Sequence, residues 1–213
     1  MSDTRQRILE QARALFNAEG LARVGVREVA RAAGIAPGNL GYHFPTKDDL
    51  VAALVLELHQ RTEQEVFIAL PPSMSLLQLY RSAAVGMRGI LAYRFLPLSA
   101  GEAARASPRL RRLRAALRDR RRERHDLLLR ALAKGGHLEL RRVLPRSGWL
   151  FEQGELISSG WVAAAALQGR TDDAAVILHY AKVGVALLEP WCTPKGAREL
   201  RRILSGACDQ RDP

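Results

Sequence analysis

Residues 26–44 spell VREVARAAGIAPGNLGYHF, the most informative part of this chain. Two short helices are predicted to meet at Gly34, which supplies the backbone conformation that a tight turn needs, and Pro37 suits the first turn of the second helix. Ala30 lies four residues before the glycine, and its small side chain lets the two helices cross at close range. The apolar positions that such a pair must bury are Val29, Ala33, Ile35 and Leu40. The pattern predicts a helix-turn-helix.

The second helix of this pair would expose a face with side chains suited to DNA. Asn39 can donate and accept hydrogen bonds at an adenine edge. Tyr42 and His43 have the reach for phosphate oxygens, and Lys47 at the start of the next helix could add another. The exposed set is Pro37, Gly38, Asn39, Gly41, Tyr42 and His43. The alternative is a helical hairpin inside an ordinary bundle.

The rest of the chain also has helical periodicity, and glycines and prolines fall between the periodic segments. Strand alternation is absent from the sequence. The predicted helices cover residues 4–19, 26–33, 37–42, 46–69, 74–92, 99–106, 108–134, 147–168, 172–188 and 194–205. We therefore expect an all-α fold, with a three-helix helix-turn-helix domain at the N-terminus and a larger helical domain after it.

Charge is unevenly distributed along the 213 residues. The net charge is +11, which suits a polyanionic partner. Residues 105–146 carry 15 basic and 4 acidic residues, so this one segment holds the whole excess. The sequence shows no membrane span and no secretory signal, and it has two cysteines, Cys192 and Cys208. These features predict a cytoplasmic protein without a disulfide framework.

Catalytic and metal-binding patterns are absent from the sequence. There is no GxxxxGK loop, no HExxH and no Ser/His/Asp arrangement. The histidines are scattered without ligand spacing, and the cysteines do not form a CxxC pair. We expect no enzyme activity, no metal and no cofactor.

Three elements in order, RILEQARALF, EG and VREVARAAGIAPGNLGYHFPTKDDLV, resemble the N-terminal DNA-binding domain of the TetR/AcrR family. They cover residues 4 to 55. The resemblance implies a homodimer that binds a palindromic operator in double-stranded DNA and is released by a small ligand. It also implies DNA contacts from Arg27, from the exposed residues of the second helix of the pair, and from Lys47. Two positions depart from the family: Gly25 replaces a capping Ser or Thr, and Gly41 replaces an aromatic residue.

On this basis residues 1–50 form the DNA-binding domain and residues 51–213 the effector-binding and dimerisation domain. The helices at 147–168 and 172–188 resemble those through which family members dimerise, and small and apolar residues cover much of their circumference. The candidate interface residues are Trp161, Ala164, Ile177, Tyr180, Gly184 and Leu188. Burial in the core of the protomer is the alternative for this set.

Ten arginines lie in residues 105–124, and the apolar stripe of that helix predicts inward positions near Arg120 or Arg121 and at Arg124. An inward arginine needs a partner. It could pair with Glu102, Asp126, Glu152 or Glu155, it could turn outward, or it could face an effector pocket that binds an anion. The first arginines could also contact DNA phosphates. The candidate effector-binding residues are Arg121, Arg124, His125, Tyr93, Trp149 and Phe151.

The sequence therefore predicts a ligand-responsive DNA-binding regulator, most simply a repressor, whose ligand tilts the long fourth helix and changes the half-site spacing. The alternative is an architectural DNA-binding protein of the same fold without a small-molecule effector.

Overall fold

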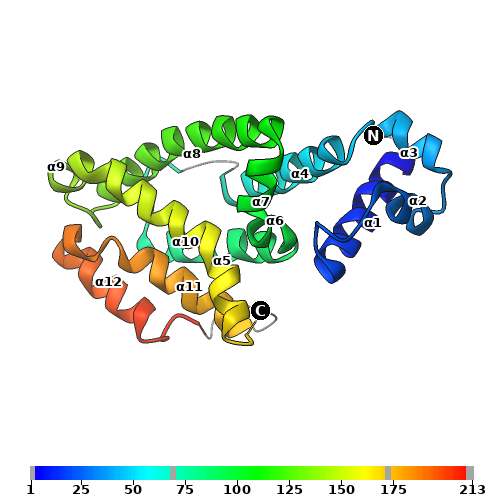
Figure 1. The fold of residues 1–213 in the computed structure, drawn as a ribbon. Helices are drawn as coiled ribbons and strands as arrows, with labels where there is room; N and C mark the ends of the chain where they lie inside the picture. Colours follow the sequence, from blue (N-terminus) through cyan, green and yellow to red (C-terminus); the bar gives the residue numbers. More distant parts are fainter. Residues whose placement is uncertain (1–2, 68–70, 171–173, 210–213) are drawn as a thin grey trace. The chain divides into compact units, whose positions relative to one another are not determined.

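The computed structural model describes residues 3–67, 71–170 and 174–209, and they are almost entirely helical (Figure 1). The helices are α1 Asp3–Glu19, α2 Val26–Ala32, α3 Pro37–His43, α4 Lys47–Phe67, α5 Leu76–Leu91, α6 Phe95–Leu98, α7 Ala100–Ala106, α8 Pro108–Lys134, α9 Leu140–Val143, α10 Ser147–Leu167, α11 Ala174–Ala186 and α12 Pro194–Leu204. Two 3-10 turns, Leu144–Arg146 and Glu189–Trp191, precede α10 and α12.

The predicted all-α fold is confirmed. Predicted and observed helix ends agree to within about two residues. Parts of the predicted helices 46–69 and 172–188 lie outside the described residues. The sequence did not predict α6 and α9, because a four-residue helix is too short to show a periodic pattern.

The chain divides into two compact units. Unit 1 comprises Met1–Arg61 and Ala92–Leu117, and unit 2 comprises Thr62–Leu91 and Arg118–Pro213. Helices α4 and α8 both begin in unit 1 and end in unit 2. Unit 1 thus contains α6, α7 and the start of α8 in addition to the predicted DNA-binding segment 1–50.

Unit 1 gains these later helices through contacts with α1. Phe16 and Phe95 pack with their ring centroids 5.1 Å apart, and both are buried. Asn17 fixes the same junction: its Nδ2 donates to the Ala92 carbonyl at 2.9 Å, and its Oδ1 accepts from the Phe95 amide at 3.2 Å. Residues far apart in sequence therefore share one apolar core.

The turn between α2 and α3 has the predicted geometry. Gly34 has a φ of +66°, in the left-handed region that favours glycine. The Ile35 amide donates to the Ala30 carbonyl at 3.0 Å, which closes the turn, and Ala30 is fully buried. Leu40 is the one residue of α3 in the core, so the helix is held by one anchor and presents its other positions to solvent.

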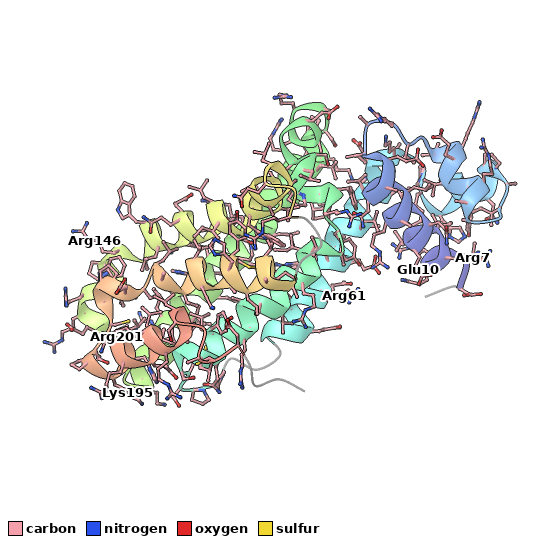
Figure 2. All side chains as sticks on the ribbon, turned by 90° about the horizontal axis from the view of Figure 1, so that it is seen from below. Arg7, Glu10, Arg61, Arg146, Lys195 and Arg201 are labelled. Atoms are coloured by element: carbon pink, nitrogen blue, oxygen red, sulfur yellow. The ribbon has the colours of Figure 1, made fainter. Side chains whose placement is uncertain are left out.

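Unit 2 is built around α11, which packs along α5 and is flanked by α10 and α12 (Figure 1). The start of α12 lies against the backbone of His137, where a Cβ on Gly196 would come within 2.1 Å of the His137 carbonyl oxygen. The Tyr80 hydroxyl donates to Asp209 at 2.7 Å, and Lys182 pairs with the same carboxylate at 2.6 Å. Basic side chains such as Arg146, Lys195 and Arg201 lie on the surface of this unit (Figure 2).

Candidate nucleic-acid interface

The exposed face of α3 is the candidate DNA-reading surface. Tyr42 has 84% of its surface exposed, and Pro37, Gly38 and Asn39 are also exposed. Gly41 and His43 are half-buried, and the Tyr42 and His43 rings meet edge to face at 5.4 Å. Arg27 is exposed in the first turn of α2. Among the described residues no hydrogen bond is formed by the side chain of Asn39 or Tyr42, so both are available to an external partner.

The two glycines that depart from the family pattern weaken local helix structure. Gly25 is the N-cap of α2 and has no side chain to accept from the first turn. The Glu28 carboxylate accepts from the Gly25 amide instead. A Cβ on Gly41 would meet no atom within 4 Å, so packing does not require glycine there. The consequence of Gly41 is an α3 with less helix propensity and a flatter outer face.

Lys47 is engaged inside unit 1. Its ammonium donates to the Leu21 carbonyl and lies 5.8 Å from the centre of the Phe16 ring. Burial lowers the pKa of the Lys47 ammonium, against the opposing effect of nearby carboxylates, of which Glu102 is the strongest. A phosphate contact by Lys47, as the family resemblance implies, therefore requires this side chain to leave or share its carbonyl partner.

The start of α4 is capped as expected. The Thr46 hydroxyl accepts from the Asp49 amide at 3.1 Å and donates to the Asp49 carboxylate at 2.7 Å, and the Thr46 amide donates to that carboxylate at 3.0 Å. Arg109 of α8 pairs with the same carboxylate. The hydrogen bond from Thr46, with a smaller contribution from Arg109, holds the pKa of Asp49 below its ordinary value.

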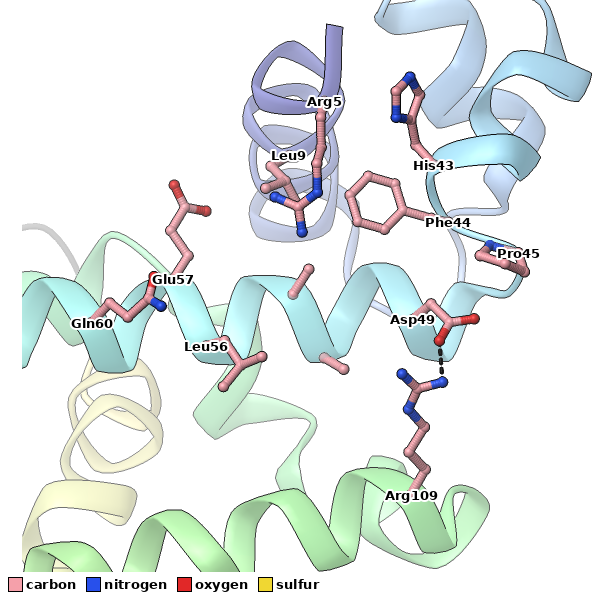
Figure 3. A pocket seen from close by; sticks show the side chains of 12 residues that line it. Arg5, Leu9, His43, Phe44, Pro45, Asp49, Leu56, Glu57, Gln60 and Arg109 are labelled. Atoms are coloured by element: carbon pink, nitrogen blue, oxygen red, sulfur yellow. Dashed lines mark hydrogen bonds and ion pairs between the residues drawn. The ribbon is translucent and has the colours of Figure 1, made fainter. Parts of the chain in front are cut away.

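A hollow of about 410 Å³ lies beside this pair, lined by α1, the α3–α4 turn, α4 and α8 (Figure 3). The Arg5 side chain extends toward α4 from α1, and Arg109 extends toward Asp49 from α8 (Figure 3). The Arg5 guanidinium lies 5.1 Å from the centre of the Phe44 ring. Arg5 was not predicted as a site residue; its place one helical turn before Leu9 on the apolar face of α1 is the signal that could have indicated it.

Several arginines of α8 in unit 2 are paired with protein groups. Arg121 binds Glu155 through two hydrogen bonds of 3.0 and 2.8 Å, which confirms the predicted ion pair with one of its candidate partners. Arg118 pairs with Glu152, three residues before Glu155. Arg120, the other candidate inward position, is exposed.

Arg124 and Arg122 are satisfied by groups on other elements. Arg124 pairs with Glu63 of α4, a partner that the sequence did not indicate. Arg122 donates to the Ser147 carbonyl at 2.7 Å and lies 3.5 Å from Asp126. Four arginines of the basic segment, Arg118, Arg121, Arg122 and Arg124, thus form ion pairs within unit 2.

Unit 2 also contains a largely apolar cavity of about 280 Å³ between α5, α8, α10 and α11. Of the candidate effector-binding residues, Arg121 and His125 line it. Arg124 and Phe151 line an adjoining hollow of about 150 Å³, which shares Arg121 and His125 with the cavity.

Two of the predicted effector-binding residues are placed elsewhere. Tyr93 is fully buried in the core of unit 1, in the same cluster as Phe95 and Phe16. Trp149 is 71% exposed and lines neither hollow of unit 2. Aromatic residues at helical spacing can line a pocket or pack in the core, and the sequence does not specify which face each side chain occupies.

The predicted dimer set needs a similar correction. Trp161, Ile177 and Leu188 have 2%, 6% and 6% of their surfaces exposed within one protomer, so they offer almost no surface to a second copy. Ala164, Tyr180 and Gly184 are half-buried, and Gly184 and Leu188 line the cavity. The apolar circumference of α11 is explained by its central place in unit 2.

His125 lines both the cavity and the adjoining hollow. Burial, followed by the nearby Arg122 charge, lowers the pKa of the His125 imidazole, so the ring is neutral at pH 7. Its Nδ1 is buried and lies 3.8 Å from Asp126, too far for a hydrogen bond. The neutral ring can give or accept one hydrogen bond in the cavity.

These features define a class of protein: a helix-turn-helix unit joined to a helical unit with a largely apolar cavity. Residues 8–54 match the family described as "Bacterial regulatory proteins, tetR family", and residues 60–200 match "Bacterial transcriptional repressor". The chain belongs to the TetR family of transcriptional regulators, a family of regulators and not of enzymes.

Curated relatives match about a quarter of this chain. TtgR of Pseudomonas putida is 38% identical over 58 residues, 27% of this chain and 28% of its own length. UidR of Escherichia coli K12 is 34% identical over 58 residues, 27% of this chain and 30% of its own length. The matched stretch therefore spans less than a third of these relatives.

Solved structures share the whole fold. A TetR-family regulator from Marinobacter aquaeolei VT8 matches over 100% of both chains, with a TM-score of 0.78 and 22% identity. A regulator from Saccharomonospora viridis, solved in complex with choline, has a TM-score of 0.66 and 18% identity over 91% of this chain and 100% of its own. The fatty acid degradation regulator FadR of Bacillus halodurans has a TM-score of 0.64 and 18% identity, over 87% of this chain and 96% of its own.

Within the described residues, no helix is long and apolar enough to cross a membrane, and no group of three or more His, Cys, Asp or Glu residues is placed to hold a metal ion.

Proposed function

We propose that the protein is a ligand-responsive transcriptional repressor that binds a palindromic operator as a homodimer. The observation that carries this proposal is the face of α3, where Asn39 and Tyr42 are exposed beside a single buried anchor, Leu40. A short helix with one buried anchor and an outward polar face is suited to the major groove. The predicted contacts of Arg27, Pro37, Gly38, Gly41, His43 and Lys47 belong to this proposal.

Unit 1 carries more positive charge than the segment 1–50 alone. Residues 1–61 and 92–117 hold 14 basic and 8 acidic residues, a net charge of +6, against +1 for residues 1–50. Five of the seven added arginines come from α7 and the start of α8, where Arg105 and Arg112 are exposed. The charge of the whole unit supports attraction to the phosphate backbone.

A homodimer is supported by the outer face of α10. Trp149, Leu156 and Leu167 have 71%, 71% and 91% of their surfaces exposed in one protomer. Trp149, Leu156 and Ala163 recur every seven residues, the spacing of a continuous helical seam. Exposed apolar residues in such a row favour burial against a second copy of the same helix.

A ligand in the cavity can regulate DNA binding because α4 and α8 belong to both units. Arg121 and His125 line the cavity from α8, and Thr62 lines it from α4. These two helices can adopt more than one conformation, and a ligand that binds one conformation more tightly increases its population. We propose that the ligand binds more tightly to the conformation that does not bind DNA, so the ligand relieves repression.

The architectural alternative requires a filled interior, and the cavity of about 280 Å³ argues against it. One related structure was solved in complex with choline, and another is a regulator named for fatty acid degradation. Similarity of fold therefore does not transfer a ligand to this chain.

The experiment that tests the proposal is selection of bound sequences from random duplex DNA, followed by fluorescence anisotropy with the recovered site at two salt concentrations. Recovery of one palindrome, bound by two protomers and at least about 10³-fold more tightly than random DNA, is the expected result. Binding without sequence preference would favour the architectural alternative. No binding to any duplex would overturn the proposal.

A further inference from the structure

The cavity in unit 2 has a wall chemistry that selects among ligand classes. Most of its lining is aliphatic, from residues such as Met87, Ile90, Leu129 and Ile157. The polar lining groups are the hydroxyls of Thr62, Ser82 and Ser158, the His125 imidazole and the Arg121 guanidinium. An occupant must therefore be mainly apolar, with few polar groups.

Arg121 is the one cationic residue among the described residues of this wall, and its charge is already matched. Both of its hydrogen bonds to Glu155 are short, and Glu155 is more buried than Arg121, with 25% against 40% of the side chain exposed. The adjoining hollow repeats the arrangement, because Arg124 pairs with Glu63.

A ligand of either charge would find the opposite charge in the wall already paired, because Arg121 and Glu155 bind each other. An anion would have to displace Glu155 from a bidentate pair, leaving a half-buried carboxylate without its partner. A cation would find Glu155 already engaged by Arg121. Desolvating a ligand charge without a counter-charge is strongly unfavourable. The cavity thus disfavours the anionic effector that was one interpretation of the arginine-rich sequence.

His125 supplies the remaining polar feature. It lies on the wall shared by both hollows, and burial keeps its ring neutral. A neutral imidazole hydrogen-bonds well to a hydroxyl, phenol or carbonyl group. Ser82 and Ser158 add neutral donors and acceptors on the other helices.

We propose that the effector of this protein is an uncharged, mainly apolar small molecule with one hydroxyl or carbonyl group that hydrogen-bonds to His125, and that the Arg121–Glu155 pair excludes carboxylates. This inference rests on the proposed function and specifies the ligand of the same site.

The test uses three probes of one shape: 2-naphthol, 2-naphthoate and 2-naphthylmethylammonium at pH 7.5. Binding to the full-length protein without DNA is measured by calorimetry and by the shift in melting temperature. We expect 2-naphthol to bind at least about ten-fold more tightly than either charged probe. Equal or tighter binding of a charged probe, or binding of none of the three, would overturn the proposal.

A matched pair of variants tests the role of the ion pair. Glu155→Gln removes the charge that neutralises Arg121, so 2-naphthoate should gain about ten-fold in affinity while 2-naphthol changes little. Glu152→Gln breaks the neighbouring Arg118 pair, which lines neither hollow, and should leave all three affinities unchanged. If both variants give the same response, Arg121–Glu155 has no selective role and the proposal is wrong.

A second pair of variants tests whether the ligand binds in this cavity. Gly154 lines both hollows, and a Cβ there would meet no atom within 4 Å, so Gly154→Leu fills the space without a backbone clash. It should abolish 2-naphthol binding, whereas Gly101→Leu on α7, an open position in unit 1, should not. Retained binding in Gly154→Leu would overturn the proposal. Because these assays contain no DNA, their failure is separate from a failure of operator binding, which is measured without ligand.

Discussion

The two units of this protein use polar side chains in opposite ways. In unit 1, Asn39 and Tyr42 lie on the outside of α3, and no hydrogen bond from either side chain is found among the described residues. In unit 2, Arg121 and Arg124 are half-buried and each pairs with a glutamate of another helix. In unit 1 the hydrogen-bonding groups of these side chains can bind an external partner. In unit 2 the arginine side chains bind other helices of the same unit instead.

Helix α8 shows the same difference along its own length. Arg112, in its first turns and in unit 1, is exposed, whereas Arg118 and Arg121 face Glu152 and Glu155 at the matching spacing of three residues on α10. A run of one residue type therefore does not have one role. Its role depends on which carboxylates the neighbouring helix provides.

The largest expected effect is on operator binding by the α3 surface. Asn39→Ala should weaken binding to the selected operator by about 1–3 kcal/mol, because a good base contact is worth that much. The melting temperature should not change, since Asn39 packs on nothing in the core. Anisotropy and thermal unfolding measure the two effects, with Gln153→Ala on exposed α10 as the control. Equal operator affinity in both variants would remove Asn39 from the interface.

The next effect concerns the exposed arginines of unit 1. The double variant Arg105→Gln/Arg112→Gln should reduce the slope of log K against log salt by about 0.9 for each DNA phosphate that the protein no longer neutralises. The matched double variant Arg120→Gln/Arg130→Gln removes two exposed arginines of unit 2 and should leave the slope unchanged. Identical slopes for the two variants would show that α7 and α8 neutralise no additional phosphate.

A smaller effect is expected on stability from the paired arginines. Glu155→Ala leaves Arg121 without its bidentate partner and should lower the free energy of unfolding by about 1 kcal/mol. Solvent limits the effect, because 40% of the Arg121 side chain is exposed. Glu152→Ala breaks a more exposed pair and should cost less than about 0.5 kcal/mol. Denaturant unfolding measures both, and a larger loss of stability in Glu152→Ala would contradict the ranking.

The smallest expected effect is an increase in the free energy of unfolding. Gly25→Ser places a capping hydroxyl at the start of α2 and should stabilise the protein by about 0.5 kcal/mol. The new Cβ would lie 3.3 Å from the end of the flexible Glu28 side chain, which can move. Arg23→Ser, two residues earlier in an exposed turn, is the control. An unchanged or lower midpoint of unfolding for Gly25→Ser would show that Glu28 already caps the helix as well as serine can.

The helix-turn-helix was predictable because its determinants are local. Ala30, Gly34 and Leu40 lie within eleven residues of one another in sequence. The structure places Gly34 in the left-handed conformation and buries Ala30 and Leu40, as the sequence indicates. The cavity was not predictable to the same degree. Arg121 and His125 line it, but Tyr93 belongs to unit 1 and Trp149 to the surface, because their faces depend on packing between distant segments.

The sequence by itself determined where the helices longer than four residues begin and end, and that the second helix of a helix-turn-helix follows Gly34, because glycine, proline and apolar spacing act on neighbouring residues. Only the tertiary structure decided that α7 and the start of α8 belong with the DNA-binding unit, and that Arg124 pairs with Glu63. Those outcomes require helices distant in sequence to pack in one register, and many registers satisfy the same local pattern. The chemistry of the cavity follows from that register, since an arginine selects an anion only when no carboxylate of the protein already holds it.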